Sequence, residues 1–191
     1  TGLINDTPTQ YEAGSYIINI SCSDGTINTS QNFTYTINDA TSPTFSSAIN
    51  TSLNFRRYQN FTANITIDNF ALDYYIFSTN ASGTWTNLSR DISGAQYNAS
   101  EQSNITLPQN STICWYYWSN DSSSNLATST TYCFTVQNTA PTFNTSLTNQ
   151  TANSNQEFLY DINCSDLDQD TLTYYDNTSL FNINETTGLI N

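Results

Sequence analysis

Large apolar side chains alternate with small polar ones in several segments of this chain, as in FTANITI at 61–67 and FTYTI at 33–37. A period of two is typical of a strand with one buried face. No window repeats its apolar residues at helical spacing. The pattern therefore predicts an all-β chain. We expect strands at 14–22, 31–38, 59–67, 72–79, 84–88, 103–107, 112–119, 127–136, 156–164, 171–175, 180–183 and 188–190.

Two pairs of segments resemble each other. Residues 21–37 align with 118–136, and each segment is typical of a strand–turn–strand hairpin. In this alignment Asp24 falls on Asp121, Phe33 on Tyr132, Tyr35 on Phe134 and Ile37 on Val136. Residues 35–45 likewise parallel 134–143, each running from a last strand through a proline linker into a new first strand. Pro43 and Pro141 lie 98 residues apart. This spacing suits a seven-stranded sandwich.

The last five residues, TGLIN at 187–191, repeat the first five at 1–5. Such self-similarity indicates one period of a tandem array. The period is 186 residues, the offset between Thr1 and Thr187. The sequence then predicts a complete sandwich at 41–139. Residues 140–191 would form the N-terminal half of a second sandwich. Residues 1–40 would form its C-terminal half, so that this domain is completed across the repeat boundary by residues 1–40 of the next copy.

Charge is scarce and one-sided. Only 10% of the residues are charged, the net charge is −13, and Lys, His and Met are absent. An acidic chain is unsuited to nucleic acid and to anionic membrane surfaces, and no apolar run predicts membrane insertion in this segment. Without His or Lys, the commonest general bases and nucleophile activators are missing, so we expect no enzyme and no catalytic residue. Paired carboxylates of the glycosidase kind remain the enzymatic alternative.

Asparagine sequons are far more frequent than composition requires. Of 27 Asn residues, 18 lie in N-x-S/T, whereas about eight are expected by chance. We expect covalently attached N-glycans, which would supply the solubility that charge does not; the alternative is that Asn- and Thr-rich strands form sequons by default. The predicted sites are Asn5, Asn19, Asn28, Asn32, Asn50, Asn60, Asn64, Asn80, Asn87, Asn98, Asn104, Asn110, Asn120, Asn144, Asn149, Asn163, Asn177 and Asn184. Asn120 and Asn149, in turn-like segments, are expected among the first to be modified.

Three phrases of the split domain resemble the cadherin-like or immunoglobulin-like (Ig-like) modules of prokaryotic surface proteins. They are FNINETTGLI at 181–190, AGSYIINI at 13–20 and the hairpin that begins with SDG at 23–25. The central domain resembles the Ig-like repeats of archaeal surface proteins through SGTWTN at 82–87 and CWYYWSNDSSSN at 114–125. The resemblance implies two Ig-like or cadherin-like β-sandwiches, used outside the cell for reach, adhesion or assembly, and no catalytic site.

Four cysteines in this composition suggest two disulfides and a secreted or surface location. Side chains alternate faces along a strand, so Cys114 and Cys133 both point outward from one hairpin, and we expect a cross-strand bridge between them. Cys22 and Cys164 each stand two residues before an aspartate. A bridge resembling the immunoglobulin pattern would join Cys164 to Cys22 of the following copy.

Acidic residues and outward aromatic rings supply the remaining candidate sites. Asp166, Asp168 and Asp170 resemble the acidic element by which cadherins hold calcium at domain junctions, since clustered carboxylates suit that ion; the alternative is a solvated acidic loop. The split domain has 11 acidic and no basic residues, whereas the central domain has all three arginines. Arginine–carboxylate contacts could therefore set inter-domain or lateral contacts. Outward Tyr116 and Trp118 would form a lateral interface, a sugar platform, or merely scattered surface rings.

Together these features predict a structural extracellular protein, the repeat unit of a glycosylated surface filament or stalk. Its partners would be neighbouring copies of itself, joined head to tail, with lateral bundling between the resulting strings. The alternatives are an adhesin that recognises another cell or a polysaccharide, and a cell-wall lattice protein. The sequence leaves open whether copies are joined through the backbone or by strand complementation between chains.

Overall fold

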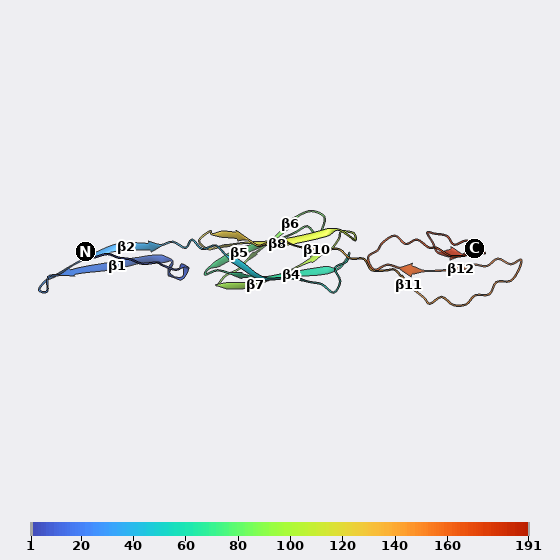
Figure 1. Cartoon of the computed structure of the whole chain (residues 1–191), viewed down its shortest axis with the longest axis horizontal. Coiled ribbons are helices and arrows are strands. Elements are labelled where there is room, and N and C mark those ends of the chain that lie inside the picture. Colours follow the sequence, from blue (N-terminus) through green and yellow to red (C-terminus); the bar gives the residue numbers. More distant parts are fainter. Residues whose placement is uncertain (1, 191) are drawn as a thin grey trace.

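The computed structural model describes residues 2–190, so Thr1 and Asn191 of the repeated pentapeptide lie outside it. The described residues form strands and one short 3₁₀ turn, η1 (Gln10–Glu12), and no α-helix, so the all-β prediction is confirmed. Three parts follow one another along the longest axis (Figure 1): a hairpin, a central sandwich, and a C-terminal part with little regular structure.

The central part is a β-sandwich of two antiparallel sheets. One sheet has the order β3-β4-β7, and the other has the order β10-β8-β5-β6 with β9 beside β8. The first sheet contains β3 (Thr44–Thr51), β4 (Asn60–Asp68) and β7 (Gln96–Asn104). The second contains β5 (Leu72–Thr79), β6 (Thr86–Asp91), β8 (Thr112–Asp121), β9 (Leu126–Thr128) and β10 (Tyr132–Thr135). Two strand predictions need correction, because 103–107 covers only the end of β7 and 127–136 is divided between β9 and β10.

The core of this sandwich lies between the two sheets and follows the alternation in the sequence. Its fully buried members include Phe61, Ile65, Ile67, Ile105, Ile113, Trp115, Tyr117 and Val136. The Tyr117 hydroxyl donates to the carbonyl of Ala63 on the opposite sheet at 2.8 Å, and the Tyr75 hydroxyl donates to Glu101 Oε1 at 2.7 Å. Burial raises the pKa of both tyrosines well above the usual value. Apolar contact and satisfied polar groups therefore hold the sheets together.

The N-terminal part is a long two-stranded hairpin. β1 (Gly14–Ser23) and β2 (Asn28–Ile37) pair antiparallel along their whole length, with Tyr16 opposite Tyr35 and Ile18 opposite Phe33. The loop between them is closed by Asp24, whose Oδ1 accepts hydrogen bonds from the backbone N–H groups of Thr26 and Ile27. These two hydrogen bonds lower the pKa of the Asp24 carboxyl.

The C-terminal part contains four strands of two residues each: β11 (Thr142–Phe143), β12 (Tyr160–Asp161), β13 (Cys164–Ser165) and β14 (Leu189–Ile190). β11 pairs with β13, β12 pairs with β14, and Ile183 bridges Ile190. The strand predicted at 171–175 is absent, and those at 156–164 and 180–183 shrink to short pairings or a single bridge. Extended segments need a neighbour to form a ladder, and within residues 2–190 the segment 171–175 has no strand paired with it.

Candidate functional site

The β1–β2 hairpin has one apolar and one polar face. Residues directly opposite each other in an antiparallel pair share a face, so the apolar set is Tyr16, Ile18, Ile20 and Cys22 with Phe33, Tyr35 and Ile37. On this face Tyr16, Ile20 and Phe33 are each 42% exposed. An isolated two-stranded hairpin is marginally stable in water. The uncovered apolar face is therefore a candidate contact surface.

The opposite face of the hairpin is polar except for Ile17. Ser15 and Thr36 share a hydrogen bond across the strands, and Asn19 Nδ2 donates to Asn32 Oδ1. Asn19 and Asn32 are both sequon positions and are directly opposite each other, as are Ser23 and the third sequon residue, Asn28. The three sequons of the hairpin strands thus lie away from the apolar face.

The C-terminal part contains one row of half-buried residues. Phe158, Tyr160, Ile162 and Cys164 are partly buried, while the residues between them are exposed. A hollow of about 670 Å³ opens beside Phe158 and Phe181. Several large apolar residues of this part are more than half exposed, namely Phe143, Leu147, Leu159, Leu167, Tyr175 and Leu180. This part has apolar surface available for a partner.

Side chains of the central sandwich hold the linker that precedes it. Asn125 Nδ2 donates to the carbonyl of Asp39 at 3.1 Å, and Asn69 Nδ2 donates to the carbonyl of Thr41 at 2.7 Å. The ring of Tyr11 packs edge-on against Phe70 with 5.3 Å between centroids. These contacts fix the hairpin to one end of the sandwich.

An ion pair fixes the C-terminal part to the other end. Arg56 Nη1 lies 3.1 Å from Asp168 Oδ1 and also donates to the carbonyl of Leu167 at 2.8 Å. The second oxygen of Asp168 accepts the backbone N–H of linker residue Thr139 at 2.6 Å. Asp168 is only 2% exposed. This is an arginine–carboxylate contact between domains of the kind that the charge distribution suggested, whereas Arg90 pairs with Glu101 inside the central sandwich.

The acidic loop proposed for calcium has other partners in this structure. Asp166 Oδ1 accepts the backbone N–H groups of Asp168 and Asp170, and both oxygens of Asp168 are engaged as described. Within residues 2–190 no three acidic or cysteine side chains have an arrangement suited to a metal. Calcium binding by Asp166, Asp168 and Asp170 stays a prediction, and it would require Asp168 to exchange Arg56 for the ion.

The four cysteines fall into two classes. Cys114 and Cys133 lie directly opposite each other on β8 and β10 and form a disulfide, as strand parity predicts. Cys22 is exposed on β1 and Cys164 is half-buried on β13, and both are free thiols in the described part of the chain. Their strands lie at opposite ends of the structure (Figure 1), so one copy does not bring them together.

None of the 18 sequon asparagines is buried. Asn149 lies in an exposed irregular segment, as expected, whereas Asn120 lies within β8 rather than in a turn and its Oδ1 is buried. Asn80 is also constrained, because its Oδ1 accepts the backbone N–H of Cys114. The half-buried sequon residues are Asn50, Asn64, Asn80 and Asn120, and the other fourteen are exposed. Modification of any of them stays a prediction.

The outer face of the five-stranded sheet carries paired aromatic rings. Tyr116 packs against Trp85 and Trp118 packs against Tyr74, with 5.3 and 5.2 Å between ring centroids. Sequence parity identified Tyr116 and Trp118 but missed their partners, of which Tyr74 lies on β5 and Trp85 directly precedes β6. A hollow of about 360 Å³ lies beside them, lined also by Ile76, Ser78, Asn87, Thr128 and Thr131. Rings flanked by hydroxyl and amide groups can contact an amphipathic ligand.

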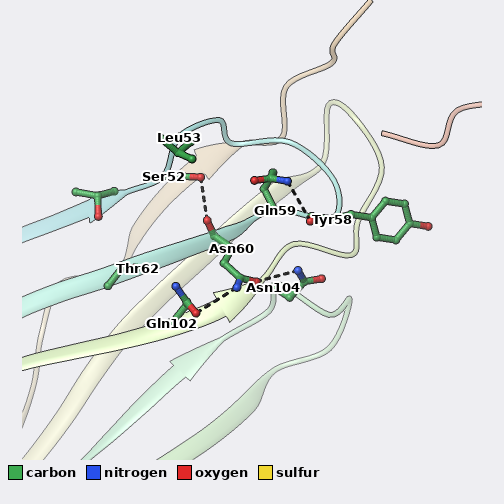
Figure 2. Close-up of a pocket in the computed structure, with 9 residues that line it drawn as sticks. Ser52, Leu53, Tyr58, Gln59, Asn60, Thr62, Gln102 and Asn104 are labelled. Atoms are coloured by element: carbon green, nitrogen blue, oxygen red, sulfur yellow. Dashed lines mark hydrogen bonds between the residues drawn. The ribbon is translucent and has the colours of Figure 1, made fainter. Parts of the chain in front are cut away.

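A second hollow, shown in Figure 2, lies where β4 and β7 meet the loop after β3. Two sequon residues line it: Asn60 Nδ2 donates to Gln102 Oε1 and Asn104 Nδ2 donates to Asn60 Oδ1. The other lining residues are Thr51, Ser52, Leu53, Tyr58, Gln59 and Thr62. Since none of these side chains is a carboxylate, the hollow offers hydrogen bonds rather than general acid–base chemistry.

No protein-family model, curated protein or solved structure matches this chain. In the part of the chain that the structure describes, no helix is long and apolar enough to cross a membrane.

Proposed function

We propose that the chain is a structural repeat unit of an extracellular surface filament or stalk, in which successive copies join head to tail. One observation carries this proposal: a hairpin with an uncovered apolar face and a C-terminal part with short strands and exposed apolar residues lie at opposite ends of one elongated molecule (Figure 1). A contact between two different surfaces that does not close on itself produces an open fibre. The proposal involves no catalysis and no nucleic acid.

Three further features support an extracellular location and a mechanical role. The Cys114–Cys133 disulfide is typical of oxidising compartments. Eighteen unburied sequons could carry glycans along the whole length of the chain. Hydrogen bonds and an ion pair hold both linkers against the central sandwich, which favours a stiff rod over a flexible string. The resemblance to Ig-like and cadherin-like surface modules agrees with this role.

The proposal is tested by sedimentation and electron microscopy of the purified 191-residue chain. We expect unbranched fibres in which each copy advances the axis by roughly 70–90 Å, two sandwich lengths at the strand rise. The mass of the reduced, deglycosylated native polypeptide then distinguishes a tandem array from assembled subunits of 21.3 kDa. A compact monomer whose residues 1–40 fold back onto its own residues 140–191 would overturn the filament proposal.

A second candidate function is polysaccharide adhesion, which the aromatic hollow of the outer sheet favours. In this case Trp118 and Tyr116 would stack on sugar rings while the exposed hydroxyl groups of Thr128 and Thr131 form hydrogen bonds. A glycan array with the Trp118→Ala variant tests it, with Leu126→Ala as an exposed apolar control. Retention of binding in Trp118→Ala, or loss in both variants, would contradict adhesion at this hollow.

A further inference from the structure

The C-terminal part repeats one sheet of the central sandwich and lacks the other. In the centre β4 pairs with β3 on one side and β7 on the other. In the C-terminal part the segment 160–165 pairs in the same way, through β13 with β11 and through β12 with β14. Within residues 2–190 this part has no strands that correspond to β8, β9 and β10, whose sheet is visible above β4 and β7 in Figure 1.

We propose that the β1–β2 hairpin of a second copy supplies these missing strands, in the position that β8 and the strands after it occupy in the central sandwich. The proposal rests on the proposed function and specifies the surface through which copies join. It also assigns Cys22 and Cys164 to an inter-sheet disulfide between copies.

The hairpin matches β8 in the hydrogen bonds of its loop and in the face on which its apolar residues lie. Asp24 Oδ1 accepts two backbone N–H groups of its loop, and Asp121 Oδ1 at the end of β8 does the same from Ser123 and Asn125. Counting back from these aspartates, the matched positions are Cys22 with Ser119, Ile20 with Tyr117, Ile18 with Trp115 and Tyr16 with Ile113. All four β8 residues are fully buried. The uncovered face of β1 is therefore the face that β8 buries in the core.

The segment before the acidic loop matches β4 by the same test. Asn69 Oδ1 accepts the N–H of Ala71, and Asp166 Oδ1 accepts the N–H of Asp168, each two residues further along. Counting back from these residues, Cys164 matches Ile67, Ile162 matches Ile65, Tyr160 matches Ala63 and Phe158 matches Phe61. The four β4 residues are buried, and their counterparts form the half-buried row of the C-terminal part.

The two correspondences place both free cysteines between the two sheets of the same sandwich. Cys22 takes the position of Ser119 and Cys164 that of Ile67, both of which are completely buried between the two sheets of the central sandwich. Cys22 stands two residues before Asp24 and Cys164 two residues before Asp166, at the ends of strands that correspond to β8 and β4, so both lie near the same end of the sandwich. The two thiols lose two electrons and two protons to a small-molecule disulfide such as oxidised glutathione, which becomes two thiols as the Cys22–Cys164 bond forms.

An unpaired segment is available beside the docked hairpin. In the centre β8 pairs with β5, and the counterpart of β5 follows the acidic loop at 171–175. There the N–H of Tyr174 donates to the carbonyl of Glu185, and within residues 2–190 no strand pairs with this segment. Neighbouring N–H groups alternate in direction along an extended chain. The edge of 171–175 that faces away from Glu185 can thus pair with β1. This pairing would complete the strand that the sequence predicts at 171–175 and that a single copy lacks.

The test uses the full chain in a glutathione redox buffer, with Cys22→Ser and Cys164→Ser variants. Alone, each variant should give only monomers in non-reducing denaturing electrophoresis, whereas the unmodified chain gives a ladder. Mixed, the two variants should form a disulfide-linked dimer that grows no further, because both remaining ends lack a thiol. Peptide mapping should show Cys22 joined to Cys164. A Cys22–Cys22 dimer of Cys164→Ser, or a Cys22–Cys164 bond within one monomer, would overturn the proposal.

A matched pair of variants tests the apolar face of the β1–β2 hairpin independently of disulfide formation. Ile18→Asp places a charge on the apolar face, and Ile17→Asp places the same charge on the opposite, already exposed face. Ile18→Asp should slow assembly at least tenfold, and Ile17→Asp should leave it unchanged. Equal assembly rates of the two variants would overturn the proposal.

Tryptophan fluorescence checks folding, because Trp115 belongs to the central core. Oxidised fibres in which peptide mapping finds no Cys22–Cys164 bond would refute this interface and retain the filament; permanent monomers would refute both.

Discussion

At the scale of single residues, the buried ion pair between Arg56 and Asp168 has the largest expected effect. Removing one partner of a buried pair leaves an uncompensated charge and costs about 3–5 kcal/mol. We expect Arg56→Met to release the C-terminal part from the central sandwich, since Asp168 also holds the linker N–H of Thr139. Faster amide exchange at Thr139 and a broader small-angle scattering profile would report the release.

Arg57 is the matched control for that variant. It donates to the carbonyl of Thr106 and stacks on Tyr58 within the central sandwich, so Arg57→Met should leave Thr139 exchange unchanged. The double variant Arg56→Met/Asp168→Leu should recover part of the loss, because apolar replacement of both partners removes the unpaired charge. Equal exchange at Thr139 in both single variants would show that the ion pair does not hold the joint.

Asp24 gives the hairpin loop a dependence on pH. Its folded pKa is lowered by the N–H groups of Ile27 and Thr26. The stabilisation is therefore complete above the ordinary aspartate pKa of about 3.9 and is lost as the pH falls through the lower folded value. We expect exchange at Thr26 and Ile27 to accelerate below about pH 4, beyond the intrinsic pH effect. Asp24→Asn keeps the acceptor oxygen and should remove this pH dependence; an unchanged profile would contradict the argument.

At the scale of elements, the disulfide ties the short strand β10 to β8. β10 has four residues, and its pairing is with β8 alone among the described strands. Cys114 and Cys133 are 19 residues apart, and closing a loop of this size stabilises a domain by about 3 kcal/mol. The double variant Cys114→Ser/Cys133→Ser should lose about that much in urea unfolding followed by tryptophan fluorescence. Cys22→Ser, on the exposed hairpin, should not shift the same transition.

Sequence alternation predicted elements well where one face is clearly apolar. The strands expected at 59–67, 72–79 and 112–119 correspond closely to β4, β5 and β8. In β4 and β8 the buried residues recur at every second position. β7 was misplaced, since its sequence QYNASEQSN is mostly polar. Its buried Glu101 is compatible with a core only because Tyr75 and Arg90 both donate to it. Such partners come from other strands and cannot be recognised from local alternation.

The candidate sites also divide into those that local sequence identifies and those that depend on distant partners. Parity along one hairpin was enough to pair Cys114 with Cys133, because the two strands are near neighbours in sequence. The contact between Arg56 and Asp168 spans 112 residues, and neither residue has a local motif that names its partner. The acidic loop was therefore interpreted as a calcium site, whereas its central carboxylate is bound to an arginine of the neighbouring domain.

At the scale of the whole molecule, the proposed interface joins two acidic surfaces. Residues 1–40 carry four acidic residues and residues 140–191 carry seven, and neither segment has a basic residue. Docking is therefore opposed by like charges and driven by apolar contact, and salt at about 0.1 M or more screens charges separated by more than roughly 10 Å. We expect fibre formation to accelerate as sodium chloride is raised from about 0.01 M to 0.5 M. An interface built on opposite charges would weaken over the same range.

Light scattering of the full chain measures the rate of fibre formation, and the Ile18→Asp variant should assemble slowly at every salt concentration. Slower assembly at high salt would exclude an apolar junction between the two acidic halves.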